Sequence, residues 1–212
     1  MGVAGNRSCA RCDGTGIVCV YCKGIGFVYR QAGDGRTVAS ECQCGKAIVR
    51  RASALRPVLE QYSSLSGDLL QKSFEGFRKR DGFPDLREAL ECAQSYAKKP
   101  KGWLVLIGKP GVGKTHLAAA IANTLRARHQ LVLFLNVPEL LAFLRAGFHS
   151  HGTQIPDFDA RLKTIKDCPV LILDDFGAHS DTPWADEQLY IILNHRTEQR
   201  LPTVITMNDK VF

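Results

Sequence analysis

No part of this sequence is apolar for long enough to cross a membrane. None of the 212 residues lies in a run that approaches the roughly 20 consecutive apolar residues that a spanning helix needs. The first residues also lack the apolar centre of a secretory signal, and Asn6 stands where a myristoylation signal requires Ser or Thr. We therefore expect a cytoplasmic protein with no membrane partner.

Acidic residues are scarce in the first half of the chain. Residues 1–101 carry 17 Lys and Arg against 10 Asp and Glu, whereas residues 102–212 carry 11 of each. The net charge of +7 therefore falls on the first half alone. A basic region of this kind fits a contact with nucleic acid or with an acidic protein surface, although charge also serves solubility.

Six of the eight cysteines form three pairs within residues 9–44. In a cytoplasmic chain, clustered cysteines are more often metal ligands than disulfides. The first two pairs are C-x-x-C turns, each followed by x-Gly-x-Gly, and such turns free backbone N–H groups to bond thiolate sulfurs. Because this segment has too few large apolar residues to fold alone, we expect Zn²⁺ to stabilise it.

Three ligand sets fit this spacing. The set that we favour is Cys19, Cys22, Cys42 and Cys44, with a short hairpin formed by residues 27–29 and 37–39 between its two pairs. A second set is Cys9, Cys12, Cys19 and Cys22, and a third is a two-zinc cluster that uses all six. Free or redox-active cysteines are the alternative to zinc. We expect the isolated Cys92 and Cys168 to be core residues.

A phosphate-binding loop stands at the centre of the chain. Residues 108–115, Gly-Lys-Pro-Gly-Val-Gly-Lys-Thr, match the pattern G-x-x-x-x-G-K-[S/T]. An apolar strand, residues 103–107, precedes the loop, and apolar residues at helical spacing follow it. Backbone N–H groups and a helix N-terminus then face the phosphates. We expect contacts to ATP from Gly108, Pro110, Gly111, Val112, Gly113, Lys114, Thr115 and His116.

Two later strands end in polar residues that complete such a site. The apolar residues 170–173 lead into Asp174 and Asp175, and residues 201–207 lead into Asn208. We expect Thr115 and Asp174 to hold Mg²⁺, and Lys114 to contact the β- and γ-phosphates. Asp175 is expected to polarise the attacking water, and Asn208 to contact the water or the γ-phosphate. The predicted catalytic residues are therefore Lys114, Asp174, Asp175 and Asn208.

Strands and helices alternate through the second half of the chain, which predicts an α/β fold with a parallel sheet. We divide the sequence into a basic zinc-binding module (residues 1–62), a linker (63–84) and a P-loop ATPase core (85–212).

The core resembles AAA+ ATPases, and within them the DnaC/DnaI-type replicative helicase loaders and the similar IstB-type helpers of transposition. The resemblance rests on residues 108–118, 171–177 and 201–208, and on the cysteine pairs followed by Ser73-Phe-Glu-Gly-Phe77. In such loaders the N-terminal module grips the hexameric replicative helicase, and the core self-associates and contacts single-stranded DNA. The resemblance also implies that Phe74 or Phe77 lies near the adenine.

The sequence departs from this family pattern at its end. It stops at Phe212, whereas the family continues with an arginine finger, a fifth core strand and a variable lid. We expect a truncated core with an open sheet edge at the loop strand, which binds ATP but hydrolyses it slowly. Arg196 and Arg200 precede Asn208, so neither matches the finger, and we expect both on a solvated helix face.

These observations favour an ATP-dependent helicase loader that acts in the initiation of DNA replication. One alternative is a transposition helper ATPase, although its usual N-terminal part lacks such cysteines. Another is a non-catalytic, zinc-dependent binding module attached to an inactive ATPase remnant.

Overall fold

The computed structural model describes residues 27–31, 33, 36–41, 57, 59–78, 84–149 and 158–209. The chain divides into two compact units, residues 1–57 and residues 58–212. Among the described residues, no helix is both long and apolar enough to cross a membrane.

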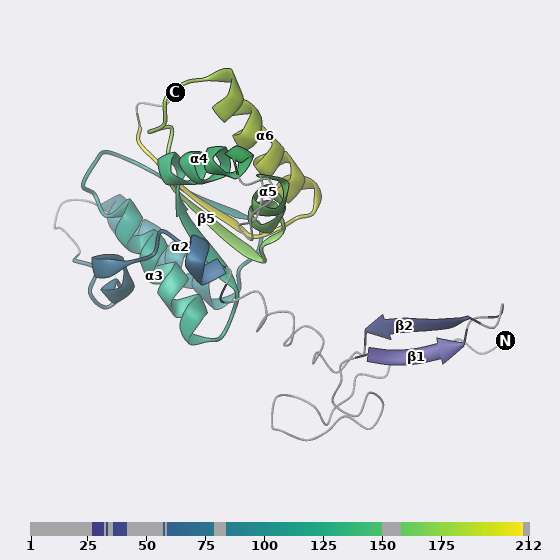
Figure 1. Ribbon diagram of the computed structural model, residues 1–212. Helices are drawn as coiled ribbons and strands as arrows, with labels where there is room; N and C mark the ends of the chain where they lie inside the picture. The colour runs from purple at the N-terminus through teal and green to yellow at the C-terminus, as the bar shows by residue number, and fades with distance from the viewer. Residues whose placement is uncertain are drawn as a thin grey trace. The chain divides into compact units, whose positions relative to one another are not determined.

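The first unit contains an antiparallel hairpin (Figure 1). Strand β1 (Phe27–Gln31) pairs with β2 (Thr37–Glu41), so that Phe27 lies opposite Glu41 and Gln31 opposite Thr37. The hairpin predicted from the sequence is therefore confirmed. The six clustered cysteines lie outside the described residues.

The second unit is built on a parallel sheet of four described strands. These strands are β3 (Trp103–Ile107), β4 (Val132–Asn136), β5 (Val170–Phe176) and β6 (Thr203–Met207). Their order across the sheet is β3-β6-β5-β4. The α/β fold with a parallel sheet is thus confirmed, and β6 lies between the loop strand β3 and the acidic strand β5.

Helices cover both faces of this sheet (Figure 1). Helices α2 and α3 lie on one face, and α4, α5 and α6 lie on the other. Their bounds are α2 Pro84–Lys98, α3 Lys114–Ala127, α4 Val137–Ala146, α5 Phe158–Asp167 and α6 Pro183–Glu198. Two short 3₁₀ helices are η1 (Gly67–Gln71) and η2 (Gly147–His149). The alanine-rich face of α3 is fully buried, because small side chains let the helix approach the sheet closely.

Residues 59–78 form the first part of the second unit and pack against its core. Leu59, Leu65 and Phe77 are buried there. The side-chain amide of Asn123 on α3 donates to the carbonyls of Leu69 at 2.9 Å and Lys72 at 2.8 Å. This segment is therefore fastened along α3 by hydrogen bonds as well as by apolar packing.

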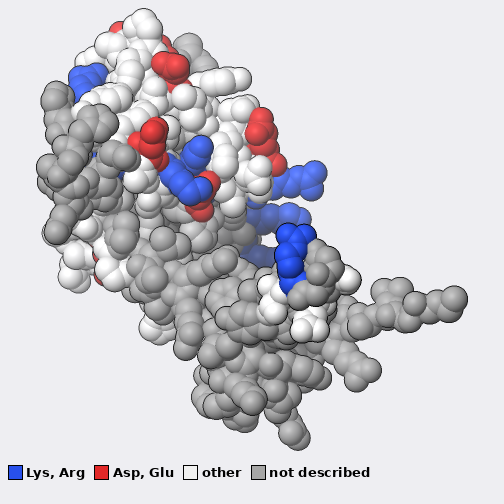
Figure 2. Space-filling model, turned by 45° about the vertical axis from the view of Figure 1, so that its right-hand side comes forward, with Lys and Arg blue, Asp and Glu red and all other residues white. Residues whose placement is uncertain are grey.

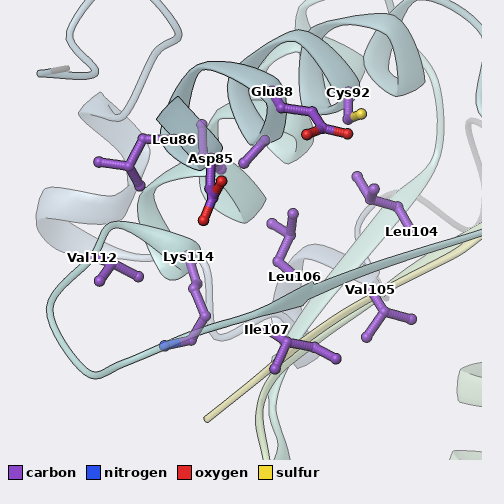
Figure 3. Close-up of a pocket in the computed structure, with 12 residues that line it drawn as sticks. Asp85, Leu86, Glu88, Cys92, Leu104, Val105, Leu106, Ile107, Val112 and Lys114 are labelled. Carbon is purple, nitrogen blue, oxygen red and sulfur yellow. The ribbon is translucent and has the colours of Figure 1, made fainter. Parts of the chain in front are cut away.

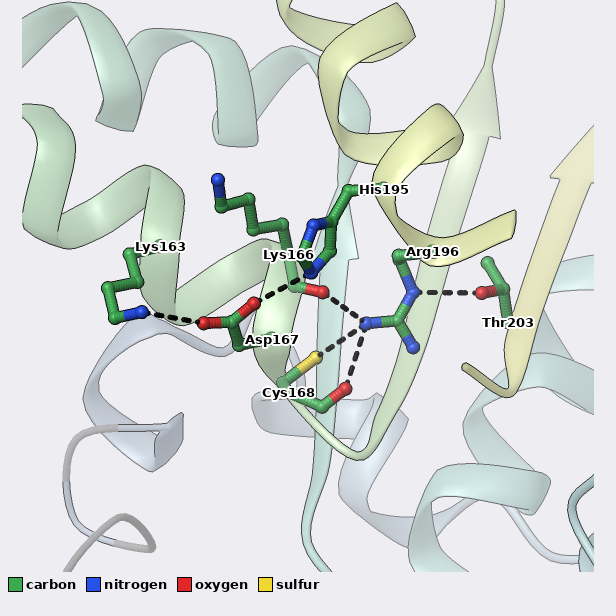
Figure 4. A network of polar contacts seen from close by, with 7 residues as sticks. All are labelled: Lys163, Lys166, Asp167, Cys168, His195, Arg196 and Thr203. Carbon is green, nitrogen blue, oxygen red and sulfur yellow. Dashed lines mark hydrogen bonds and ion pairs between the residues drawn. The ribbon is translucent and has the colours of Figure 1, made fainter. Parts of the chain in front are cut away.

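Arg196 is fully buried, and the prediction that it lies on a solvated helix face is wrong. Its guanidinium donates to the Thr203 hydroxyl at 2.9 Å and to the carbonyls of Lys166 and Cys168 at 3.0 and 2.8 Å (Figure 4). It also donates to the Pro202 carbonyl at 2.6 Å. Burial lowers the pKa of this group, and the neighbouring Cys168 opposes that shift. Arg196 thus links the end of α6 to the residues at the start of β5 and of β6. Arg200 is exposed, as predicted.

The two isolated cysteines differ in burial. Cys168 is buried, as predicted, and burial raises the pKa of its thiol to about 11. Cys92 is exposed, so its predicted place in the core is wrong. The buried stripe of α2 runs through Leu90, Ala93 and Ala97, and Cys92 lies beside this stripe.

Because Arg196 is fully buried and donates to three carbonyls and to the Thr203 hydroxyl, we expect Arg196→Ala to lower the free energy of unfolding by about 3 kcal/mol. Chemical denaturation measures the change, with exposed Arg200→Ala as the matched control. Equal stability of the two variants would contradict the role of Arg196.

Candidate nucleotide-binding site

The loop between β3 and α3 has the conformation that only glycine adopts readily. Gly111 and Gly113 have φ angles of 79° and 103°. A Cβ atom on Gly113 would also lie 2.6 Å from Cε2 of Phe77. Gly113 is the N-cap of α3, so the loop presents the helix N-terminus and its free N–H groups on one side.

The side chain of Lys114 is buried beneath this loop. Its ammonium group donates to the carbonyls of Gly108 and Lys109 at 2.9 and 3.0 Å, and to Oδ1 of Asn208 at 3.0 Å. Lys114 and Asn208 meet because β3 and β6 are adjacent and parallel. Each of the three N–H bonds of this ammonium group has an oxygen partner, and phosphate oxygens can take the place of these partners.

The two Mg²⁺ ligands predicted from the sequence also lie together. Asp174 is 3% exposed, and it accepts a hydrogen bond from the Thr206 hydroxyl at 2.6 Å. Burial raises the pKa of Asp174, and hydrogen bonds from Thr206 and from Thr115 oppose that shift. A hydroxyl and a carboxylate in contact are oxygen ligands of the kind that Mg²⁺ takes.

Asp175 occupies an irregular position at the end of β5. Its φ angle is 56°, and the pairing of β5 with β6 shifts register between Leu173 and Phe176. The Asp175 N–H donates to the Thr206 hydroxyl at 3.0 Å, and Nδ2 of Asn136 donates to Oδ2 of Asp175 at 3.2 Å. These contacts turn the two neighbouring acids in different directions, one buried and one half-buried.

Two of these residues were missed by the sequence analysis. Thr206 sits inside a strand and has a high strand propensity, so nothing in the sequence marks its hydroxyl as part of the site. Asn136 offered a signal, because it follows the apolar run of residues 131–135 just as Asp174 and Asn208 follow theirs. Carboxyl ends of parallel strands meet at one edge of the sheet.

A cavity of about 530 Å³ lies beside the loop. It is lined by Lys72, Gly76, Phe77, Arg78, Gly111, Val112, Gly113 and His116. His116 Nε2 lies 2.8 Å from the Ser73 carbonyl oxygen, and its ring meets Phe77 edge-on at 5.3 Å between centroids. The structure therefore brings Phe77 to the loop, whereas Phe74 packs partly buried against the core. One aromatic ring and two cationic side chains give this cavity the chemistry of a nucleotide pocket.

A second cavity, of about 260 Å³, lies between α2 and β3 (Figure 3). Its lining is mainly apolar, with Asp85 and Glu88 of α2 along one side. β3 is an edge strand of the described sheet, and Val105 and Ile107 are 43% and 53% exposed there. Lys114 is the one basic side chain in its lining, and the two carboxylates beside it make the cavity unsuited to phosphate.

Over the upper part of the molecule in Figure 2, acidic and basic side chains lie interspersed. This mixing agrees with the balanced charge of residues 102–212, which carry 11 side chains of each sign. Anion binding in the second unit therefore depends on the local donors of the loop rather than on a broad basic field.

The family model of the IstB-like ATP binding protein matches residues 82–211. The chain belongs to the IstB-like ATP-binding protein family. This assignment covers the loop, both acids and Asn208, and members of the family bind ATP by its description.

Similar proteins of this family include two named as replicative helicase loaders. DnaI of Bacillus subtilis is 40% identical over 117 residues, which cover 54% of this chain and 36% of DnaI. DnaC of Escherichia coli K12 is 28% identical over 142 residues, which cover 66% of this chain and 56% of DnaC. The phage-like element protein XkdC of Bacillus subtilis is 27% identical over 210 residues, which cover 93% of this chain and 74% of XkdC. The chain thus spans about a third of DnaI and about half of DnaC.

Solved structures of DnaI and DnaC are also similar to this chain. A crystal structure of DnaI has a TM-score of 0.54 at 32% identity and covers 68% of this chain and 76% of that one. A crystal structure of the DnaC helicase loader has a TM-score of 0.57 at 25% identity and covers 68% of this chain and 80% of that one. The second unit of the IstB-like chain therefore has the P-loop AAA+ fold.

Because the raised pKa of Asp174 means that its folded environment favours the protonated form, its charge costs stability. That cost grows as the pH rises above the ordinary carboxyl pKa, and it is complete above the raised folded value. We expect Asp174→Asn to raise the free energy of unfolding at pH 7, without nucleotide, by about 1 kcal/mol. Denaturation at pH 4 and pH 7 measures this, with exposed Asp181→Asn as the control. A loss of stability at pH 7 would contradict the assignment.

Proposed function

We propose that this protein is an ATP-dependent loader of a replicative hexameric helicase. The observation that carries the proposal is the arrangement of Lys114, Asn208 and the pair Thr115 and Asp174 at one edge of the sheet. The similarity to DnaI and DnaC, both named as helicase loaders, supplies the partner. We place its action in the cytoplasm, at the initiation of DNA replication.

ATP fits the residues at this site. The N–H groups around Gly111 and Gly113 form a cradle for phosphate oxygens, and the Lys114 ammonium supplies positive charge beneath it. Thr115 and Asp174 would hold Mg²⁺, which neutralises phosphate charge when bound. Phe77, Lys72 and Arg78 line the space that remains for the base and sugar.

The site also holds groups that would position water for hydrolysis. Asp175 carries a half-buried carboxylate beside the predicted Mg²⁺ ligands, and this group would accept a proton from the attacking water. Asn208 would hold the water or the γ-phosphate through its amide, while Lys114 stabilises the charge that develops on phosphate. We propose ATPase activity on this basis.

We further propose that the second unit contacts single-stranded DNA and associates with other copies. Phe148, Phe158 and Trp184 form an aromatic cluster, in which Phe148 stacks on Phe158 at 4.5 Å and is 45% exposed. The Arg145 guanidinium lies 4.7 Å from the centre of the Trp184 ring. An exposed ring in an aromatic cluster beside a cation is a usual platform for unpaired bases.

The first unit is proposed to bind Zn²⁺ and to contact the helicase. Phe27 and Glu41 pair at the end of the hairpin where the chain enters and leaves it. Cys42 follows Glu41 directly, and Cys22 precedes Phe27 by five residues, so this hairpin favours Cys19, Cys22, Cys42 and Cys44 over the other two sets. Its basic charge suits an acidic surface on the helicase.

A transposition helper ATPase is the second candidate, because the family model bears the name IstB-like and covers most of the second unit. Both candidates share the nucleotide site, so the partner distinguishes them.

We expect Lys114→Ala to weaken ATP binding by about 100-fold, because it removes the cation beneath the phosphates. Exposed Lys101→Ala, outside the loop, is the matched control and should bind ATP normally. Equilibrium binding of a labelled ATP analogue measures both, and steady-state hydrolysis should fall with binding. Unchanged affinity in Lys114→Ala would remove the basis of the proposed site.

The partner is tested by capture of a purified hexameric helicase on the zinc-loaded 212-residue chain, in the presence of ATP and Mg²⁺. We expect capture of the helicase and none of a purified transposase. The reverse result would favour the transposition helper, and capture of neither would contradict a loading role.

We expect Cys42→Ser to abolish stoichiometric zinc binding and Cys9→Ser to leave it unchanged. Metal analysis of the purified variants measures the zinc content. If Cys9→Ser loses the metal and Cys42→Ser keeps it, the ligands are the first four cysteines. Loss in both variants would indicate the six-cysteine cluster.

A further inference from the structure

Two side chains of α3 hold the segment that precedes α2. Asn123 donates to the carbonyls of Leu69 and Lys72, and Nε2 of His116 lies 2.8 Å from the carbonyl oxygen of Ser73. Seven residues, about two helical turns, separate His116 from Asn123, so both side chains lie on one face of α3. Because a carbonyl oxygen only accepts, Nε2 of His116 carries a hydrogen and donates it. The helix thus holds three carbonyls of this segment.

The turn from Ser73 to Phe77 has hydrogen bonds of its own. The Gly76 N–H donates to the Ser73 hydroxyl at 3.2 Å, and the Phe77 N–H donates to the Phe74 carbonyl at 3.3 Å. These two bonds keep the shape of the turn, but they do not fasten it to α3. The bond from His116 fastens it there, and it acts on the first residue of the turn.

The last residue of the turn, Phe77, forms a wall of the cavity beside the phosphate loop. Phe77 is 8% exposed, and its ring lies so close to the loop that a Cβ atom on Gly113 would be 2.6 Å from Cε2. The same ring meets the ring of His116 edge-on, with 5.3 Å between centroids. Lys72 precedes the turn, Arg78 follows it, and both also line the cavity. The position of the turn therefore sets the part of the cavity that lies outside the loop.

The backbone and the side chain of His116 contribute to the site in different ways. The backbone N–H lies in the first turn of α3, where N–H groups have no partner within the helix and can meet phosphate oxygens. The side chain is bonded to the Ser73 carbonyl instead. A substitution of the side chain leaves the backbone donor in place, so the two contributions can be measured separately.

We propose that His116 is a positioning residue that holds the wall of the base pocket and thereby favours purine nucleotides. Through Ser73 it keeps the Phe77 ring beside the loop, where a base packs against it. A purine covers more of an aromatic ring than a pyrimidine does, so a ring that is held in place favours purines. Without this bond the turn must be ordered when the nucleotide binds, which lowers affinity. The inference rests on the proposed function, because it takes a nucleotide as the ligand of this cavity.

His116→Ala tests the proposal in the whole 212-residue chain. We expect its affinity for ATP to fall about tenfold, the factor that one lost hydrogen bond allows. Its affinity for tripolyphosphate, which has no base, should stay within about twofold, because the loop and its N–H groups are unchanged. Its affinity for CTP should fall less than that for ATP. Equilibrium binding measures the three affinities, and in steady-state hydrolysis KM for ATP should rise while kcat stays within about twofold.

Two further variants show whether the lost bond is the cause. His116→Gln places an amide donor near the position of Nε2 and should restore most of the affinity for ATP. Thr124→Ala is the matched control on the same helix, because the Thr124 hydroxyl donates to the Ala120 carbonyl within α3 at 2.8 Å. It should change no affinity. Equal losses for ATP and tripolyphosphate in His116→Ala, an unchanged ratio of its ATP and CTP affinities, or a matching loss in Thr124→Ala would overturn the proposal.

A double-mutant cycle with Phe77→Ala tests whether His116 acts through the turn. Phe77→Ala should weaken ATP binding by itself, because it removes the wall against which the base packs. His116→Ala should then add little in that background, since the ring that it positions is gone. Additive losses would show that the His116 side chain acts by another route, and they would overturn the proposal.

Amide hydrogen exchange gives a readout that needs no ligand. We expect the amides of Gly76 and Phe77 to exchange faster in His116→Ala than in the unsubstituted chain and in Thr124→Ala, because a short turn has little stability once it is detached from the helix. The Lys72 amide should keep its protection, since Asn123 still holds the Lys72 carbonyl. Equal exchange of the turn in the three proteins would overturn the positioning role.

The failure of the proposed function would look different. If the unsubstituted chain bound neither ATP nor tripolyphosphate, the proposed function would be contradicted. The exchange measurement would still decide whether His116 holds the turn.

Discussion

The hydrogen bonds of the Lys114 ammonium group are the interaction on which the nucleotide site depends. They join the loop after β3 to Asn208 after β6, two places separated by most of the second unit in sequence. A buried cation is costly unless its donors are satisfied, and here three oxygens satisfy them. The same donors are the groups that phosphate oxygens require. The site is therefore stable without a ligand and already arranged for one.

The sheet order makes this arrangement achievable. Insertion of β6 between β3 and β5 places Asn208 and Thr206 between the loop and the two acids. Thr206 then serves both acids, because its hydroxyl donates to Asp174 and accepts from the Asp175 N–H. The bulge at the end of β5 sends the two carboxylates to different surroundings. One acid lies buried beside Thr115, and the other lies within reach of Asn136 on β4.

The sequence predicts the repeating parts of this fold well. Periodicity and the loop motif place the strands of residues 103–107, 170–173 and 201–207 within a few residues of β3, β5 and β6, and the predicted parallel sheet and N-terminal hairpin are both confirmed. The misses have a common cause. The burial of Arg196 and Cys92 and the contacts of Thr206 depend on which side of a helix or strand faces a neighbour distant in sequence. Composition does not reveal that side. Ser64 lies in the stretch that was predicted to be a linker. Only the structure shows that its N–H donates to the Phe134 carbonyl at the edge strand β4.

A structure of the chain with Mg²⁺ and a non-hydrolysable ATP analogue tests the central claim most directly. The account predicts that the Lys114 ammonium exchanges its bonds to Gly108, Lys109 and Asn208 for phosphate oxygens, that Thr115 and Asp174 surround the metal, and that the base lies beside Phe77. A nucleotide bound elsewhere, or bound at the loop with the three Lys114 bonds intact, would contradict it.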